Sequence, residues 1–389
     1  MVRNLPISNH TKFEHEKNKS KIKILVYSLK RNGVTILFCL FTLCLVLFSR
    51  TNLSAAKNGL ILWATAVVPS LFPFFVATEM LSYTNVVSCL GKWLTPIMRP
   101  LFGVPGEAAF AFLMGLISGY PVGAKIVSNF MEQGICTKEE AERMLAFTNN
   151  SGPLFIIGTV GVTLFGNTTI GVLLLITRIL ACISVGIILN ICTIHKRKSE
   201  FIPLYIKADI RHNDLQNIHT NSPKSEITHP TFSSLGEILG SSIKNATSTI
   251  LLIGGFVVLF SVVISILNQS HLLDNISRIF APIFSTLNIP YEFCTPLFSG
   301  IVELTNGVSL IAGLHAKNIS INIILCSFLL GFGGFSVLLQ VFSIVSKNGL
   351  SIKKYAYGKF LQGLLAALYT GLALQFIPCL LYTSPSPRD

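Results

Sequence analysis

Four apolar stretches of this chain are interrupted by glycine or proline together with polar residues. The interruptions are "LISGYPVGAKIV" (116–127), "TNNSGPLFIIGTVG" (148–161), "VELTNG" (302–307) and "LLGFGGFSVLLQ" (329–340). A helix that breaks inside hydrocarbon leaves backbone N–H and C=O groups unpaired, which costs several kcal/mol per group unless another partner satisfies them. The four breaks therefore indicate places where a solute, an ion or water is bound.

The polar and glycine residues at these breaks are the candidate substrate-binding residues. Ends of broken helices attract charged groups, and side-chain amides and hydroxyls orient a bound solute. The alternative is helix-to-helix hydrogen bonding, which Ser, Thr and Asn supply in membrane bundles. As a set, we expect the following to form the site: Ser118, Gly119, Tyr120, Lys125, Asn149, Asn150, Ser151, Gly152, Glu303, Thr305, Asn306, Gly333, Gly334, Ser336 and Gln340.

Charged residues inside apolar segments carry the chemistry that such a site would use. A charge at membrane depth costs roughly 2.5–3.5 kcal/mol, so Lys125 is either a counter-charge for an anion or an anchor reaching the interface. Glu303 would bind a coupling cation or a proton, or pair with a basic residue. We expect Arg178 to pair internally. Glu107 and Glu292 stand beside prolines and are expected to stabilise helix N-termini.

The elements that must position these residues are membrane-spanning helices. Hydrophobic residues make up 51% of the chain and charged ones 12%, against about 25% charged residues in soluble domains. Apolar runs such as 34–48, 170–192, 250–267 and 360–380 match the hydrocarbon core, which takes about 20 helical residues. The sequence therefore predicts an all-α polytopic membrane protein.

The net charge of +13 does not point to nucleic acid. The basic residues flank apolar runs, as in the positive-inside pattern, so we expect a cytoplasmic N-terminus and no nucleic-acid partner. The nine cysteines include no Cys-x-x-Cys pair, and the apolar segments hold no nucleophile–base pair. We therefore expect no metal, no cofactor and no enzymatic activity, and a coupling ion such as sodium or a proton stays open.

The two halves of the chain repeat the same order of residues. Pro96, Pro105, Glu107 and Gly115 are followed later by Pro282, Pro290, Glu292 and Gly300, and each Glu-to-Gly gap is eight residues. Basic clusters at 92–99, at 196–198 and at Lys347, Lys353, Lys354 and Lys359 fall on one membrane face if the second copy is inverted. We expect two inverted repeats, each with a re-entrant hairpin and a broken transmembrane helix.

These boundaries divide the chain into six parts. They are a basic cytoplasmic arm (1–33), an extra N-terminal transmembrane helix (34–58), the first repeat (59–194), a polar cytoplasmic loop and lead-in (195–245), the second repeat (246–381) and a tail that does not look native (382–389).

The four break motifs resemble those of the YlbJ-type sporulation integral membrane proteins over residues 59–380. That family belongs to the nucleoside-recognition (Gate) group, which is similar to concentrative nucleoside transporters. The resemblance implies a bacterial membrane protein of the mother cell or outer forespore membrane that moves dipicolinic acid, a small aromatic dicarboxylate, toward the forespore. A nucleoside-like solute carrier and a non-transporting spore-envelope assembly protein remain as alternatives. The expected partners are a small-molecule anion and the lipid bilayer, with homo-oligomerisation left open.

Overall fold

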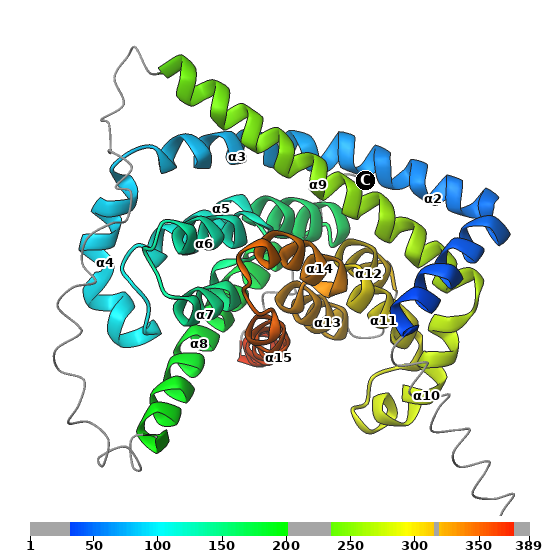
Figure 1. Cartoon of the computed structure of the whole chain (residues 1–389). Helices are drawn as coiled ribbons and strands as arrows, with labels where there is room; N and C mark the ends of the chain where they lie inside the picture. The colour runs from blue at the N-terminus through cyan, green and yellow to red at the C-terminus, as the bar shows by residue number, and fades with distance from the viewer. Residues whose placement is uncertain (1–31, 201–234, 315–318, 377–389) are drawn as a thin grey trace, which may run out of the picture. The chain divides into compact units, whose positions relative to one another are not determined.

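The computed structural model describes residues 32–200, 235–314 and 319–376, and all regular structure within these ranges is helical (Figure 1). The chain divides into two units, Met1–Ala55 and Ala56–Asp389. Most of the basic arm, most of the 195–245 loop and the tail lie outside the described residues.

The first unit contains a bend instead of the single transmembrane helix predicted over 34–58. Helix Asn32–Leu47 meets the helix that begins at Ser49 at an angle of 98°. The side-chain amide of Asn52 donates a hydrogen bond to the Cys44 carbonyl across the bend, at 3.1 Å. The Cys44 carbonyl also accepts from the Phe48 backbone N–H at 3.0 Å, so a side chain beyond the bend adds a second hydrogen bond to it.

The second unit is a bundle of helices joined mostly by short connections. Its first half comprises the end of α2 (Ser49–Leu62), a π-helical turn η1 (Trp63–Val67), α3 (Val68–Ser82), α4 (Val86–Phe102), α5 (Ala108–Ser118), α6 (Val122–Glu132), α7 (Lys138–Thr148), the π-helical segment η2 (Leu154–Leu164) and α8 (Thr168–Glu200). Its second half comprises α9 (Leu235–Gln269), α10 (Leu272–Thr286), η5 (Tyr291–Phe293), α11 (Cys294–Val302), α12 (Leu304–Ala312), α13 (Ile319–Phe332), α14 (Gly334–Val345), η6 (Ser346–Asn348) and α15 (Lys353–Phe376).

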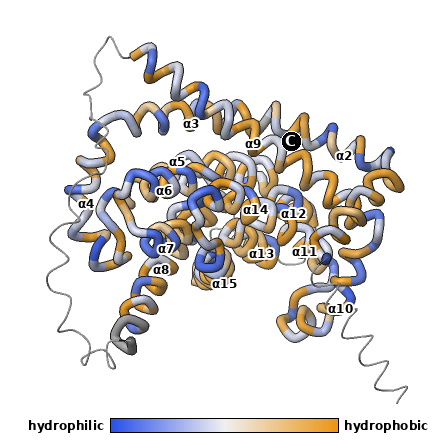
Figure 2. The backbone as a smooth tube through the Cα atoms, in the orientation of Figure 1, coloured by the Kyte–Doolittle hydropathy of each residue, from blue (hydrophilic) through white to orange (hydrophobic). Residues whose placement is uncertain are grey.

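Three helical stretches are long and apolar enough to cross a membrane: Thr168–His195, Leu235–Gln269 and Ile319–Asn348. Counting the bent pair at the N-terminal end as one span raises the number within the described residues to four. Figure 2 shows hydrophobic residues along most of α9 and α13, whereas α7 carries a hydrophilic stretch. The predicted membrane class agrees with these elements.

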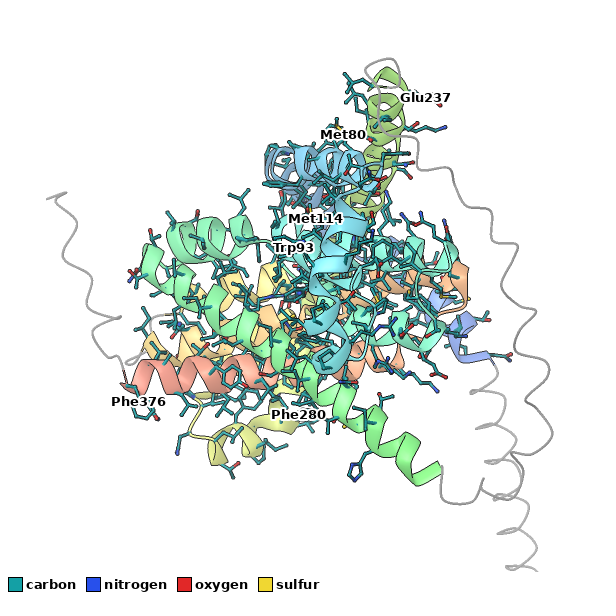
Figure 3. The ribbon with its side chains drawn as sticks, turned by 90° about the vertical axis from the view of Figure 1, so that its left-hand side faces the viewer. Met80, Trp93, Met114, Glu237, Phe280 and Phe376 are labelled. Atoms are coloured by element: carbon teal, nitrogen blue, oxygen red, sulfur yellow. The ribbon has the colours of Figure 1, made fainter. Side chains whose placement is uncertain are left out.

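Two helices of the second unit are amphipathic. They are α4 (Val86–Phe102) and α10 (Leu272–Thr286). Trp93 of α4 and Phe280 of α10 are exposed, and both are labelled in Figure 3. An exposed tryptophan on an amphipathic helix suits the level of the lipid headgroups.

All four predicted helix breaks are present. Residues 119–121 separate α5 from α6, residues 149–153 separate α7 from η2, Glu303 separates α11 from α12, and Gly333 separates α13 from α14. Gly119 and Gly333 have φ values of +84° and +86°, which side-chain-bearing residues rarely adopt. Glycine is therefore what allows the chain to turn at these two breaks.

The short helices beside the breaks pack through glycine. Gly115 of α5 and Gly123 of α6 both lie directly against the Thr148 carbonyl at the end of α7. In the second half, a Cβ atom on Gly300 would lie 3.1 Å from the Cα of Gly307, which places α11 tightly against α12. Close backbone packing therefore holds each pair of short helices together.

Replacing Gly115 by alanine should destabilise the second unit, because the new methyl group would collide with the Thr148 carbonyl. Overpacking of this kind costs about 1–3 kcal/mol, so thermal unfolding in detergent should show a lower midpoint. Gly255→Ala in α9 is the control, since its methyl group would meet nothing within 4 Å. Equal midpoints for the two variants would contradict the proposed close packing.

Candidate functional site

Two cations are buried side by side in the second unit. Arg178 of α8 is 1% exposed and Lys359 of α15 is 0% exposed. The sequence predicts Lys359 in a basic cluster at the membrane surface, and this prediction is wrong because the side chain is enclosed. Within residues 32–200, 235–314 and 319–376, neither cation forms an ion pair with Asp or Glu.

Four helices bring these cations together. Helices α7, α8, α13 and α15 pack against one another, and they lie close together in Figure 1. Arg178 lies about three turns into α8, and Lys359 lies about two turns into α15. Gly331 of α13 lies against the backbone of Gly363, so α13 and α15 approach closely beside the lysine. The cations therefore belong to the centre of the bundle.

Arg178 connects three of the helix breaks. Its Nη1 donates to Ser151 Oγ at 3.2 Å and to the Leu330 carbonyl. Its Nη2 donates to the Tyr120 hydroxyl at 3.1 Å and to Asn150 Oδ1 at 3.3 Å. The arginine thus contacts residues of the first and second breaks and the turn of α13 that precedes the Gly333 break. It pairs internally as the sequence predicts, but only with neutral acceptors.

Lys359 is held by two amides. Its Nζ donates to Gln362 Oε1 at 2.8 Å and to Asn150 Oδ1 at 3.1 Å. The same Nζ lies 5.4 Å from the ring centroid of Tyr120 and 5.8 Å from that of Tyr355. Aromatic faces attract a cation, more strongly where water is excluded, and so they offset part of its burial. We call Tyr120, Asn150, Ser151, Arg178, Lys359 and Gln362 the cation cluster.

Asn150 is the centre of the cation cluster. Its Oδ1 accepts hydrogen bonds from Arg178, from Lys359 and from Gln362 Nε2, the last at 3.1 Å. Its Nδ2 donates to the Phe147 carbonyl at 2.7 Å and to Cys182 Sγ at 3.3 Å. A reversed amide would turn its NH2 group toward two cations and its oxygen toward a carbonyl. The surroundings therefore fix the amide with its oxygen toward the cations.

Three buried polar atoms around the cluster have no hydrogen-bond partner within the described residues. They are Arg178 Nε, Asn149 Oδ1 and Thr148 Oγ1. Buried polar groups are normally satisfied, and leaving one unpaired costs about 1–3 kcal/mol. Unused donor and acceptor capacity next to two cations is expected of a site that receives a solute or water.

The break at 149–153 positions the cluster because its backbone is not helical. Asn149 is extended, with φ −98° and ψ +104°, and this conformation ends α7. Its side-chain amide donates to the Tyr355 hydroxyl at 2.9 Å.

At the fourth break, a Cβ atom on Gly333 would lie only 2.8 Å from the Tyr120 hydroxyl. The absence of a side chain at Gly333 therefore makes room for the tyrosine that contacts Arg178.

The structure brings about half of the sequence-predicted site residues together. Tyr120, Asn150 and Ser151 belong to the cluster, and Asn149 adjoins it. Three glycines form the neighbouring backbone: Gly119 and Gly152 lie against each other, and Gly333 contacts Tyr120. The site predicted from the sequence stays a prediction, but these residues share one place in the fold.

A second group lies at the third break. The Glu303 carboxylate accepts from the backbone N–H groups of Thr305 and Asn306 at 3.0 and 2.8 Å and so caps α12. The amide of Asn306 donates to Ser299 Oγ at 3.0 Å. Gly334 packs near the start of α12, because a Cβ atom on it would lie 3.2 Å from the Leu304 nitrogen. Ser336 and Gln340 are buried on α14. None of these side chains hydrogen-bonds to either cluster cation.

Lys125 has a different set of partners from the cluster cations. It forms an ion pair with Glu79 of α3, and its Nζ donates to Thr249 Oγ1 of α9 at 3.2 Å. Asn245 Nδ2 donates to the other carboxylate oxygen of Glu79 at 3.2 Å. Ser118 lies nearby, 3.1 Å from Thr78 through their hydroxyls. Because a carboxylate already neutralises Lys125, the cluster cations are better placed to act as counter-charges.

Comparison with known proteins shows which protein family the chain belongs to. The Gate family model, described as nucleoside recognition, matches residues 64–193 and 250–348, more than half of the chain. The chain therefore belongs to the Gate family of membrane proteins, which points to a transporter-like protein rather than an enzyme.

More narrowly, the chain belongs to the YlbJ family of sporulation integral membrane proteins. It is 34% identical over 359 residues to the sporulation integral membrane protein YlbJ of Bacillus subtilis (strain 168), covering 91% of this chain and 84% of that relative. The resemblance seen in the four break motifs is thereby confirmed. No solved structure matches the chain.

The Lys125–Glu79 pair should behave as a coupled unit in unfolding experiments. Lys125→Met and Glu79→Gln should each lower the unfolding midpoint, because each removes the counter-charge of a largely buried partner. The double variant should lose less free energy of unfolding than the two single variants lose together, with a coupling energy of about 0.5–3 kcal/mol. Lys92→Met combined with Glu79→Gln is the control, since Lys92 is exposed on α4. Additive effects for Lys125 and Glu79 would show that the pair contributes no coupling.

Proposed function

We propose that this protein is a membrane carrier that binds a small organic anion between Arg178 and Lys359. The supporting observation is that two fully buried cations meet only neutral oxygen acceptors. A buried cation without a counter-charge is costly, and such residues in membrane segments usually serve function. A bound carboxylate would supply the missing charge through charge-assisted hydrogen bonds.

The helix ends around the cluster support an anionic solute. Helix α6 begins just after Tyr120 and Pro121, η2 begins just after Ser151 to Pro153, and α14 begins just after Gly333. Each N-terminus carries partial positive charge from its unpaired N–H groups. Three such ends start within a few residues of the cluster, so the local field adds to that of the two cations.

We further propose that the two halves are inverted repeats. The Gate model matches two segments that overlap the expected repeats at 59–194 and 246–381. Each segment holds a pair of short helices packed through glycine, α5 with α6 and α11 with α12, followed by a helix broken at glycine or proline. Inverted repeats with broken helices near the bilayer midplane are the architecture of secondary transporters.

Dipicolinate is the solute we propose, moved from mother cell toward forespore. Membership of a sporulation family supports a role during sporulation. Two carboxylates match two cations, and the rings of Tyr120 and Tyr355 beside Lys359 suit an aromatic solute. The description of the Gate model favours a nucleoside as the second candidate. A neutral nucleoside, however, would leave both cations uncompensated.

Removing either cluster cation should weaken dipicolinate binding. Arg178→Gln and Lys359→Gln should each lower affinity roughly ten- to a hundred-fold, the usual effect of losing a charge-assisted hydrogen bond. The measurement is uptake of labelled dipicolinate into liposomes carrying the purified protein. Lys353→Gln is the matched control, because this lysine lies on the same helix and is exposed.

Other outcomes of the uptake experiment would overturn the proposal. Wild-type uptake of uridine without dipicolinate would favour the nucleoside carrier. Uptake of neither solute, with spore formation unaffected by Arg178→Gln and Lys359→Gln, would favour an envelope assembly role.

The inverted topology predicts which side of the membrane each half exposes. With a cytoplasmic N-terminus, a cysteine at Ser270 should react with an impermeant thiol reagent added outside cells. A cysteine at Lys353 should react only after permeabilisation. Both positions are exposed, and the experiment uses a background without the nine native cysteines. The reverse labelling pattern would exclude this topology.

A further inference from the structure

We infer that the neutral amides of Asn150 and Gln362 set the charge of the solute that this site accepts. Both are the side-chain acceptors of Lys359, and Asn150 is shared with Arg178. Because neither amide carries charge, the cluster keeps two positive charges for the solute. The site therefore selects a dianion over a monoanion. This inference rests on the proposed anion carrier.

The amide oxygen of Asn150 occupies the position of a counter-anion. Arg178 Nη2 and Lys359 Nζ approach this single atom to 3.3 and 3.1 Å, and Gln362 Nε2 approaches it to 3.1 Å. An amide oxygen has two lone pairs, so three donors exceed what it can satisfy well. The cations therefore hold their bonds to Asn150 weakly compared with the bonds that a carboxylate would offer.

A carboxylate of the solute can displace this amide. Hydrogen bonds between ionised partners are roughly twice as strong as neutral ones, and a carboxylate offers about four acceptor positions. The amide nitrogen keeps Asn150 in place through Phe147 and Cys182 while its oxygen is exchanged. Gln362 donates to Asn150 and accepts from Lys359. A carboxylate that displaces the Asn150 oxygen from the cations would therefore also replace the Gln362 oxygen at Lys359.

An acid at either amide position should convert the site to one net positive charge. Asn150→Asp places a permanent carboxylate where the amide oxygen meets both cations. Gln362→Glu makes the same charge change from α15, and it provides the test if the aspartate variant fails to fold beside the Phe147 carbonyl. Asn167→Asp is the control, because Asn167 is also buried and its Oδ1 accepts from the Thr169 and Ile170 backbone N–H groups at the start of α8, not from either cation.

The experiment compares two inhibitors of labelled dipicolinate uptake, dipicolinate itself and picolinate, which has the same ring with one carboxylate. Near neutral pH the wild type should prefer dipicolinate. In Asn150→Asp and Gln362→Glu, the affinity for dipicolinate should fall roughly ten-fold or more while that for picolinate is kept or improved. Asn167→Asp should keep the wild-type preference.

Thermal unfolding in detergent gives an independent readout. Dipicolinate should raise the unfolding midpoint of the wild type more than that of either acidic variant. A wild type that binds dipicolinate, with an unchanged dipicolinate-to-picolinate preference in the folded acidic variants, would overturn the inference and leave the carrier proposal standing. A wild type that binds neither compound would overturn both.

Discussion

The second unit depends on how one amide oxygen is shared by two buried cations. Arg178 and Lys359 lie on helices far apart in sequence, and Asn150 Oδ1 is the atom that both of them contact. Like charges that share an acceptor repel each other unless the surroundings compensate. The rings of Tyr120 and Tyr355 and the Leu330 carbonyl provide part of that compensation. The packing of α7, α8, α13 and α15 must hold these groups in place.

The helix breaks supply the acceptors that the two buried cations need. A continuous helix would point its carbonyls along the axis and pair them internally, leaving none for a guanidinium. The break after Thr148 instead exposes Asn150 and Ser151 to Arg178, and the end of α13 offers a carbonyl. Tight glycine contacts allow the broken pieces to approach closely. The breaks and the buried charges therefore belong to one arrangement.

The positions of the breaks could be predicted from the sequence, because glycine, proline and polar residues within apolar runs are local signals. The importance of Lys359 could not, since a lysine six residues into a helix that starts with Lys353 and Lys354 resembles a surface cluster. Its burial comes from α8 and α13 packing on α15, which depends on long-range contacts. The available signal was a lysine followed by Gln362 among apolar residues, which is unusual at membrane depth.

The contact between Tyr120 and Gly333 links the two halves of the chain at the candidate site. The tyrosine hydroxyl lies against the Gly333 backbone in the second half and accepts a hydrogen bond from Arg178 in the first. A relative movement that separated α6 from α14 would pull this hydroxyl away from one neighbour or the other. Solute affinity and the spacing of the halves would then change together at a single side chain. No further residues would then be needed to couple solute binding at the site to movement of the two halves.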